Sequence, residues 1–406
     1  MLSSSRPARG VLIGAVLLAV GVASASAEGW RVKVQGGGAD LGETPVVVEL
    51  KAEVPVGDYV LQANGDEKSL PAHVFQDDGK RYLGVVLDHV KGSAPESYTM
   101  RRETKSELSP PGVELRRKGP NVEVVVGGKP LTEYLTDDGP KPFYFPVIGP
   151  TGVAVTRAFP MKQVEGEDKD HPHQRSLWFT HGKVNGIDFW SELKGHGSIK
   201  ETAKKTVAGG SAVGLIRTTD DWIGPDGRKV CEDERVVRFY NTAKARVFDF
   251  DIALKATDGP VTFGDTKEGM FGVRVASSMD VDKKKGGKIT NAEGLTDDKA
   301  WGQPSPWVDY TGPVGRETLG IAILNHPKSF RHPTTWHVRP YGLFAANPFG
   351  WHDFRQKRSG DYTLAAGESI RFHYRLILHT GDTASAQLPR AYQAYAEPPT
   401  INVVAE

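Results

Sequence analysis

The sequence contains a single cysteine, Cys231, among 406 residues. An intramolecular disulfide is therefore excluded, and the fold must be held together by its apolar core. Cys231 lies in the charged string Lys229–Glu234, whose carboxylates would raise the pKa of its thiol. We therefore do not expect Cys231 to act as a nucleophile.

Long hydrophobic runs are missing beyond the N-terminus. The apolar run Val11–Val22 is shorter than the roughly 20 residues that a membrane-spanning helix needs. It follows Arg6 and Arg9 and precedes Ala25-Ser26-Ala27, which is the order of a cleavable secretory signal. We therefore expect residues 1–27 to be a signal peptide and the protein to be exported, periplasmic or extracellular, with no membrane insertion after cleavage.

Neither sign of charge dominates. The chain has 51 Lys and Arg against 50 Asp and Glu, and loss of Arg6 and Arg9 with the signal would leave a formal charge of −1. This balance does not favour a nucleic-acid partner. The glycine-rich strings Gly36-Gly37-Gly38 and Gly209-Gly210 lack the lysine and the serine or threonine of a phosphate loop, so no nucleotide cofactor is expected.

Short alternating runs separated by turn residues fill most of the chain. Residues 28–108 contain such runs, for example Val46–Leu50, and the turn signal Asn64-Gly65, which predict a small N-terminal β domain. A linker is expected at Ser109-Pro110-Pro111-Gly112 because prolines fix the backbone and remove hydrogen-bond donors. The second domain is expected to span residues 109–406.

Strand-like patterns continue through the second domain. Val247–Ile252 alternates apolar and acidic residues with a period of two. In the segment 370–379 the apolar residues Ile370, Phe372, Tyr374, Leu376 and Leu378 would line one face, opposite Arg371, His373, Arg375 and His379. Only Ala384–Ala396 has a helical pattern. The predicted fold class is all-β, an antiparallel β-sandwich.

Reactive side chains are densest between Asp168 and Gly182. If this segment is extended, His171, His173 and Arg175 share one face, because side chains two residues apart point to the same side. Imidazoles at this spacing either transfer protons near neutral pH or bind a transition metal, and the arginine favours an anionic or oxygen-rich substrate group. The alternative is a polar loop whose histidines hydrogen-bond backbone groups.

A second cluster of His, Arg, Asn and Trp lies between Arg331 and Asp353, a composition typical of binding surfaces. Glu268, where a strand-like run meets glycines, is the carboxylate expected to act as a general base. If the two clusters meet in space, they form one pocket. The expected catalytic residues are His171, His173, Arg175, His181, Glu268 and His337. The expected substrate-binding residues are Trp178, Asp188, Trp190, Arg339, Tyr341, Asn347 and His352.

Four segments carry a resemblance to a known family: KPFYFPVIGPTG at 141–152, HPHQRSLWFTHGKVNGIDFW at 171–190, FGDTKEG at 263–269 and HPTTWHVRPYGLFAANPFG at 332–350. Together they resemble the bacterial PmoA-like family of unknown function, common in planctomycete-type genomes. The family's label, "methane oxygenase", implies a subunit with several spanning helices, which this sequence lacks, so that activity is not adopted. The resemblance also implies a β-sandwich of the galactose-mutarotase type, an architecture shared by sugar epimerases, polysaccharide lyases and some glycosidases.

The leading hypothesis is an exported carbohydrate-active enzyme, a hydrolase, lyase or epimerase, that uses the His/Arg/Glu cluster. A second hypothesis is a metal-dependent enzyme with His171, His173 and His181 or His337 as ligands to a divalent metal, although no signature such as H-E-x-x-H is present. A third is a non-catalytic glycan-binding protein. These hypotheses differ in whether the histidine cluster transfers protons, binds metal or only contacts a ligand.

Overall fold

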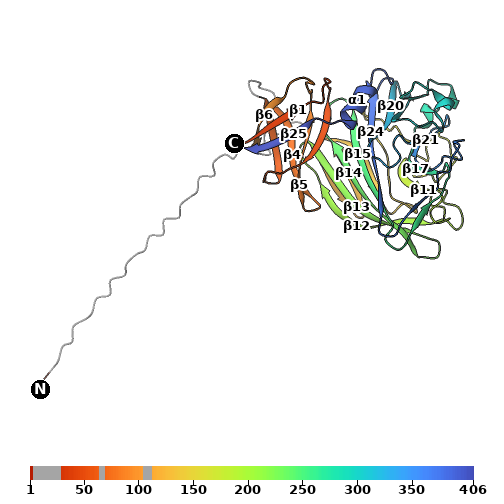
Figure 1. The fold of residues 1–406 in the computed structure, drawn as a ribbon, viewed down its shortest axis with the longest axis horizontal. Helices are drawn as coiled ribbons and strands as arrows, with labels where there is room; N and C mark the ends of the chain where they lie inside the picture. The colour runs from red at the N-terminus through yellow and green to blue at the C-terminus, as the bar shows by residue number, and fades with distance from the viewer. Residues whose placement is uncertain (3–28, 64–68, 104–111) are drawn as a thin grey trace.

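The computed structural model describes residues 1–2, 29–63, 69–103 and 112–406 (Figure 1). The predicted signal peptide, the Asn64-Gly65 turn and all of the predicted linker except Gly112 lie outside these residues. The described part of the chain contains antiparallel sheets, three short 3-10 helices and one α-helix. The prediction of an all-β fold is confirmed.

The N-terminal sheet has seven antiparallel strands in the order β2-β5-β4-β3-β6-β1-β25. Its strands are β1 (Trp30–Gln35), β2 (Thr44–Glu49), β3 (Gly57–Ala63), β4 (Ser69–Asp77), β5 (Lys80–Leu87), β6 (Glu96–Arg102) and β25 (Thr400–Ala405). The last strand pairs with β1 over its whole length, from Trp30 opposite Ala405 to Gln35 opposite Thr400. Residues 400–405, which the sequence analysis assigned to the second domain, therefore complete the N-terminal sheet.

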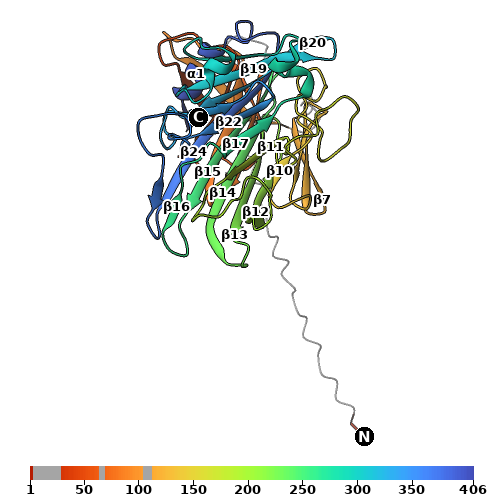
Figure 2. The same cartoon turned by 90° about the vertical axis from the view of Figure 1, so that its right-hand side faces the viewer.

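The main body is a sandwich of two eight-stranded antiparallel sheets. The first sheet contains β7 (Val113–Lys118), β8 (Asn121–Val126), β9 (Lys129–Leu135), β10 (Phe143–Tyr144), β11 (Leu177–His181), β17 (Gly269–Arg274), β21 (Thr335–Val338) and β22 (Leu343–Asn347). The second sheet contains β12 (Ser198–Ala208), β13 (Val213–Ile223), β14 (Lys229–Tyr240), β15 (Arg246–Lys255), β18 (Lys288–Asn291), β19 (Trp307–Val314), β20 (Glu317–Asn325) and β24 (Ser369–Thr380). Figure 2 shows the molecule with β11, β17 and β22 of the first sheet labelled among the strands of the second.

A continuous aromatic core joins the two sheets. Phe271 of β17 stacks on Tyr374 of β24 with ring centroids 4.8 Å apart and contacts Phe250 of β15 at the same distance. The predicted inward face of residues 370–378 is confirmed, because all five of its apolar side chains belong to this core. The alternation of apolar and polar residues with a period of two was therefore sufficient to predict which face of this strand is buried.

The remaining elements are short. They are β16 (Val261–Phe263) and β23 (Tyr362–Leu364), which pair with each other, the 3-10 helices η1 (Ser277–Met279), η2 (Val281–Lys283) and η3 (Asp297–Ala300), and α1 (Leu388–Ala396). The predicted helix at 384–396 is confirmed only from Leu388 onward. Gln387 has φ of 49°, a left-handed conformation that cannot continue a helix, so the helix starts at the next residue.

The N-terminal sheet forms a third layer against the outer face of the second sheet (Figure 1). Phe75 and Val86 pack on Val213, Leu215 and Val236 of β13 and β14. A second link is the ion pair between Asp77 of β4 and Arg217 of β13, with Nη2 2.6 Å from Oδ2. Because apolar and ionic contacts both join the layers, the N-terminal sheet packs as part of the molecule.

Candidate functional site

A cavity of about 450 Å³ lies on the face of the first sheet that points away from the second. This volume is within the range of small-molecule sites in proteins. Its walls come from four segments: the loop before β11, the loop after β11, the turn before β17, and β21 with the turn that follows it. Six of the residues expected from the sequence line it: His171, His173, Glu268, His337, Arg339 and Tyr341.

His171 is held from two sides. Its Nδ1 lies 2.5 Å from Oδ2 of Asp170, and its ring lies parallel to that of Tyr341, with centroids 5.2 Å apart. The residue has φ of 44°, in the left-handed region that non-glycine residues seldom adopt. Such a conformation persists where the surrounding structure holds it, and here the contacts with Asp170 and Tyr341 hold the imidazole at the cavity wall.

Two buried arginines hold Asp170. Nη1 of Arg157 lies 2.5 Å and Nη2 of Arg274 lies 2.9 Å from Oδ1 of Asp170. Partial burial alone would raise the pKa of this carboxyl, but Arg274, the hydrogen bond with His171 and Arg157 together lower it to about 2. Asp170 is therefore ionised at neutral pH, so its carboxylate accepts a hydrogen bond from Nδ1–H of His171 and leaves Nε2 available to a ligand.

Two further histidines in the cavity are neutral at pH 7. Burial, with help from Lys141 and His171, lowers the pKa of His173 to about 4. Burial lowers the pKa of His337 to about 3 despite a backbone hydrogen bond at Lys267. Nδ1 of His337 is buried and has no hydrogen-bond partner among the described residues. A buried polar atom without a partner is costly, so a ligand that bonded it would gain affinity.

Charged groups complete the cavity. Glu268 pairs with Lys267, with Nζ 3.0 Å from Oε1, and the glutamate side chain is 30% exposed. Arg339 lies over the rings of Trp301 and Tyr341, at 5.7 Å and 5.9 Å from their centroids. The cavity thus offers an imidazole held by a carboxylate, a second carboxylate and a guanidinium.

Arg175 does not join His171 and His173 as expected. The segment turns instead of extending, because the amide of Gln174 donates to the carbonyl of His171 and that of Arg175 to His173. The guanidinium of Arg175 forms two hydrogen bonds of 3.1 Å with Glu192, which also binds the buried ammonium of Lys141. Arg175 is committed to this buried ionic cluster and does not line the cavity.

His181 also lies apart from the cavity. It is the last residue of β11 and is fully buried, with Nε2 2.8 Å from the carbonyl oxygen of Gly264 and its ring against that of Phe349. Burial lowers its pKa to about 4. The structure places this histidine in the apolar interior, where no ligand in the cavity contacts it.

The expected tryptophans are packing residues. Trp178 and Trp190 are buried against each other, with centroids 5.2 Å apart, in a small cluster with Phe143 and Leu343. Asp188 accepts hydrogen bonds from the backbone amides of Trp190 and Ser191 through Oδ1. These side chains shape the sheet surface beneath the cavity without lining it.

Asn347 and His352, two of the expected substrate-binding residues, do not line the cavity. The buried amide of Asn347 donates to the carbonyls of Thr266 and Lys267 and accepts from the amides of Phe349 and Gly350. It therefore ties the turn before β17 to the segment after β22. The side chain of His352 is 85% exposed and lies outside the cavity.

The sequence analysis did not single out Asp170, Arg157 or Arg274 as site residues. Asp170 directly precedes His171, and that adjacency is the one signal that could have identified it. Arg157 and Arg274 have no such signal, because they lie 13 and 104 residues away from Asp170 along the chain. Their roles follow only from the tertiary structure.

No metal centre is formed by the described residues: none of their His, Cys, Asp and Glu side chains gather in groups of three or more that could hold an ion. Of the expected metal ligands, His181 is buried in the core, whereas His171, His173 and the alternative ligand His337 line the cavity. Within the same part of the chain, no helix has the length and apolar character needed to span a membrane.

The chain is similar to a known protein family. The model of a family described as "Family of unknown function (DUF6807)" matches residues 121–393. The matched range contains both sandwich sheets except β7 and includes the cavity around His171. No curated protein matches the chain.

Proposed function

We propose that this chain, which belongs to the DUF6807 family of unknown function, is an enzyme that performs acid–base catalysis on a sugar-like substrate in the cavity around His171. One observation carries the proposal: His171 is oriented by the ionised Asp170 and by the ring of Tyr341 at the wall of a cavity large enough for a small molecule.

The pair Asp170 and His171 suits proton transfer. A carboxylate on Nδ1 fixes the tautomer of an imidazole and stabilises the imidazolium that forms when Nε2 accepts a proton. Arg157 and Arg274 keep Asp170 ionised and in place. His171 would therefore remove a proton from a substrate hydroxyl, a C–H group or a water molecule, and Asp170 would act as its positioning residue.

A second proton-transferring group is needed when a bond to oxygen breaks. Glu268 lines the same cavity and is partly exposed, so it can reach a bound substrate. Arg339 would stabilise negative charge that develops on a substrate oxygen.

The polar lining supports a substrate with many hydroxyl groups. Imidazole, carboxylate and guanidinium groups surround the space, and aromatic rings such as that of Tyr341 pack against the apolar faces of sugars. The resemblance to the PmoA-like family and to mutarotase-type sandwiches favours the same class by analogy. The signal-like N-terminus favours an exported protein that meets its substrate outside the cytoplasm.

The test is turnover by the purified protein on a panel of oligosaccharides, uronic acids and oxidised sugars. We expect His171→Ala to lower kcat at least about 100-fold, the usual contribution of a general base. His89→Ala is the matched control, because His89 is an exposed histidine of the N-terminal sheet region. Equal turnover by His171→Ala and the unaltered protein would remove the proposed site.

Two outcomes point to the other hypotheses. Binding of a glycan without turnover of any substrate would favour a non-catalytic glycan-binding protein. Turnover that disappears with a chelator and returns with a divalent metal would favour a metal-dependent enzyme. Either result contradicts catalysis by His171 and Asp170 alone.

A further inference from the structure

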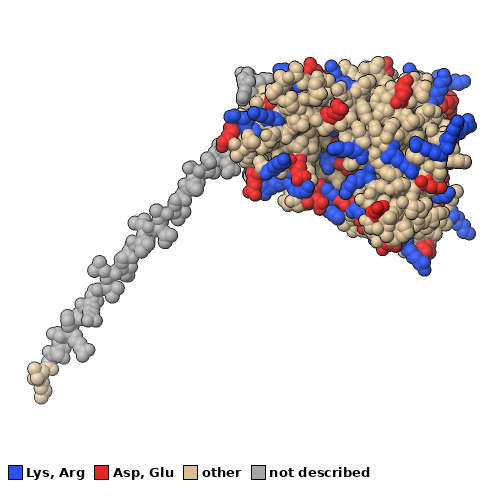
Figure 3. All heavy atoms as spheres, in the orientation of Figure 1, with Lys and Arg blue, Asp and Glu red and all other residues tan. Residues whose placement is uncertain are grey.

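A second cavity, of about 320 Å³, lies where the N-terminal sheet, the outer face of the second sheet and α1 meet. Figure 3 shows a hollow at this junction, with basic and acidic side chains around it. Its walls come from β2, β5, β14, β15, β24, α1 and the loop after β20. It lies on the opposite side of the second sheet from the first sheet, and no residue lines both cavities.

The two carboxylates of this cavity are already bonded. Asp249 accepts two hydrogen bonds from Arg375, at 2.7 Å and 2.8 Å, and a third from the hydroxyl of Tyr240 at 2.8 Å. Asp251 lies 2.5 Å from Nδ1 of His373 and also binds Nη1 of Arg238. Most of the acceptor capacity of the wall is therefore used within the protein.

Two hydrogen-bond donors in the same wall lack a hydrogen-bond partner among the residues that the structure describes. Nε of Arg238 and the hydroxyl of Tyr395 are buried and have no partner within the described ranges. Lys328 adds an ammonium group to the lining. Such an excess of donors over free acceptors suits a ligand that brings its own acceptors.

His326 contributes one more donor. Its Nδ1 accepts a hydrogen bond of 3.0 Å from the backbone amide of Lys328, which places the ring proton of the neutral form on Nε2. Burial, with His373 nearby, lowers the pKa of His326 to about 4, so the neutral form is present at pH 7. The ring of His326 contacts that of Tyr395, with centroids 4.9 Å apart.

Three tyrosine side chains, Tyr82, Tyr240 and Tyr395, provide flat walls. The guanidinium of Arg375 lies over the rings of Tyr240 and Tyr395, at 5.6 Å and 4.5 Å from their centroids. Aromatic walls suit a ring-shaped ligand, and charge-assisted donors suit an oxyanion.

We infer that this junction cavity binds a small ring-shaped organic acid, whose carboxylate is held by Arg238, Lys328 and Tyr395. The ligand would contact the N-terminal sheet and the main sandwich at once, so its binding would stabilise the junction between them. This site is separate from the cavity around His171, and its occupancy does not depend on catalysis there.

The test is calorimetric titration of the full chain with galacturonate and glucuronate, with glucose and inorganic phosphate as comparison ligands. Glucose has the ring without the carboxylate, and phosphate has the oxyanion without the ring. We expect a uronate to bind at least about tenfold more tightly than either, since a hydrogen bond to a charged group contributes about 1.5–3 kcal/mol.

Three variants locate the binding. Tyr395→Phe removes only the unpartnered hydroxyl, so we expect unchanged or higher stability and affinity about fivefold lower. Lys328→Gln removes one positive charge and should weaken binding about tenfold. Tyr374→Phe is the matched control, because its hydroxyl is also buried without a described partner but lies in the sandwich core, and binding should not change.

The inference would be overturned if no uronate bound at millimolar concentration, or if phosphate or glucose bound as tightly as the uronates. It would also be overturned if Tyr395→Phe and Lys328→Gln bound the uronates as tightly as the unaltered protein does. His171→Ala separates the two sites, because uronate binding at the junction should persist in it. Binding that disappears with His171→Ala belongs to the other cavity and contradicts a junction site.

Discussion

The imidazole of His171 lies parallel to the phenol ring of Tyr341, with 6° between the ring planes. The same Tyr341 ring also contacts Arg274, whose guanidinium carbon lies 5.0 Å from the ring centroid. Arg274 also binds Asp170, so one arginine supports both groups that orient His171. The imidazole is thus held by a closed set of contacts from three segments of the chain.

Replacement of Tyr341 tests this arrangement. We expect Tyr341→Ala to lower kcat about tenfold, because an imidazole that loses its stacking partner spends less time in the reactive orientation. Tyr341→Phe keeps the ring and should retain kcat within about twofold. Steady-state kinetics on the substrate found by screening is the measurement, and a loss in Tyr341→Phe equal to that in Tyr341→Ala would contradict a stacking role.

Asp170→Asn should change the acid dependence of stability. The pKa of Asp170 is about 2 in the folded state and lies near its ordinary value of about 3.9 in the unfolded state. The carboxylate therefore stabilises the fold above pH 4, and this contribution disappears as the pH falls from 4 to 2. Thermal unfolding between pH 7 and pH 2 should show Asp170→Asn less stable at neutral pH, with the difference shrinking in acid. A constant difference would contradict the assigned ion pairs.

His337 should make the protein less stable in mild acid. Its folded-state pKa of about 3 lies below the ordinary value of about 6.5, so the unfolded state binds the proton first. Stability from this group is complete above pH 6.5 and falls as the pH decreases, by roughly 2 kcal/mol at pH 5. Urea denaturation should show a shallower loss between pH 7 and pH 5 for His337→Gln than for the unaltered protein. His89→Gln, which replaces an exposed histidine of the N-terminal sheet region, is the matched control variant.

Deletion of residues 400–406 should loosen the N-terminal sheet. This deletion removes β25, exposes one edge of β1 and takes the buried side chain of Val403 from the core of that sheet. Amide hydrogen exchange in β1 and β6 should become at least about tenfold faster, whereas β11 and β17 of the sandwich should keep their rates. Unchanged exchange in β1 would show that β25 adds nothing to the sheet.

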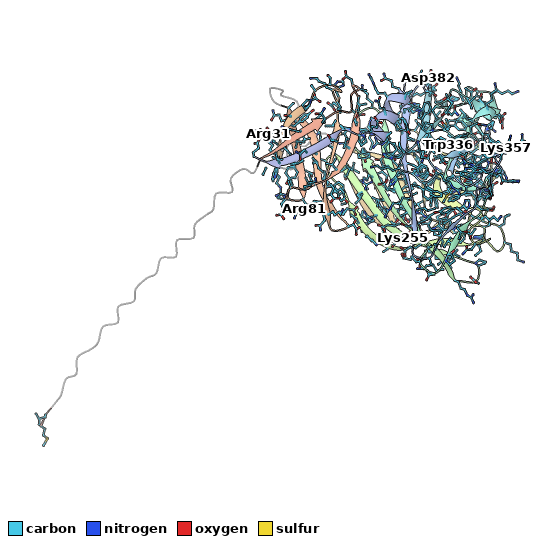
Figure 4. All side chains as sticks on the ribbon, in the orientation of Figure 1. Arg31, Arg81, Lys255, Trp336, Lys357 and Asp382 are labelled. Carbon is cyan, nitrogen blue, oxygen red and sulfur yellow. The ribbon has the colours of Figure 1, made fainter. Side chains whose placement is uncertain are left out.

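Two strands of the second sheet, β15 and β24, could be predicted because their side chains alternate. Figure 4 labels Lys255, the last residue of β15. Phe248 and Phe250 of this strand belong to the sandwich core, whereas Asp249 and Asp251 line the junction cavity on its other face, as the pattern indicates. Pairing partners could not be predicted in the same way. Nothing local in Thr400–Ala405 indicates that it pairs with Trp30–Gln35 and not with a nearer strand, because strand pairing depends on contacts between segments that are distant in sequence.

The site could be predicted by residue type but not by position. The clustering of histidines with charged and aromatic residues, together with the glutamate before Gly269, identified His171, His173, Glu268 and His337, all of which line the cavity. The same criterion also selected His181, which is buried beside Phe349. Residue type alone cannot separate an imidazole that faces a cavity from one that satisfies a backbone carbonyl.

The sequence by itself determined that the chain is all-β, which faces of β15 and β24 enter the core, and which residue types cluster in two segments near 171 and 337. The tertiary structure decided that Arg175 pairs with Glu192, that His181 is buried, and that Arg157 and Arg274 hold Asp170 beside His171. The physical reason is that alternation is a local property of a strand, whereas ion pairs and burial depend on which distant segments the sheets bring together.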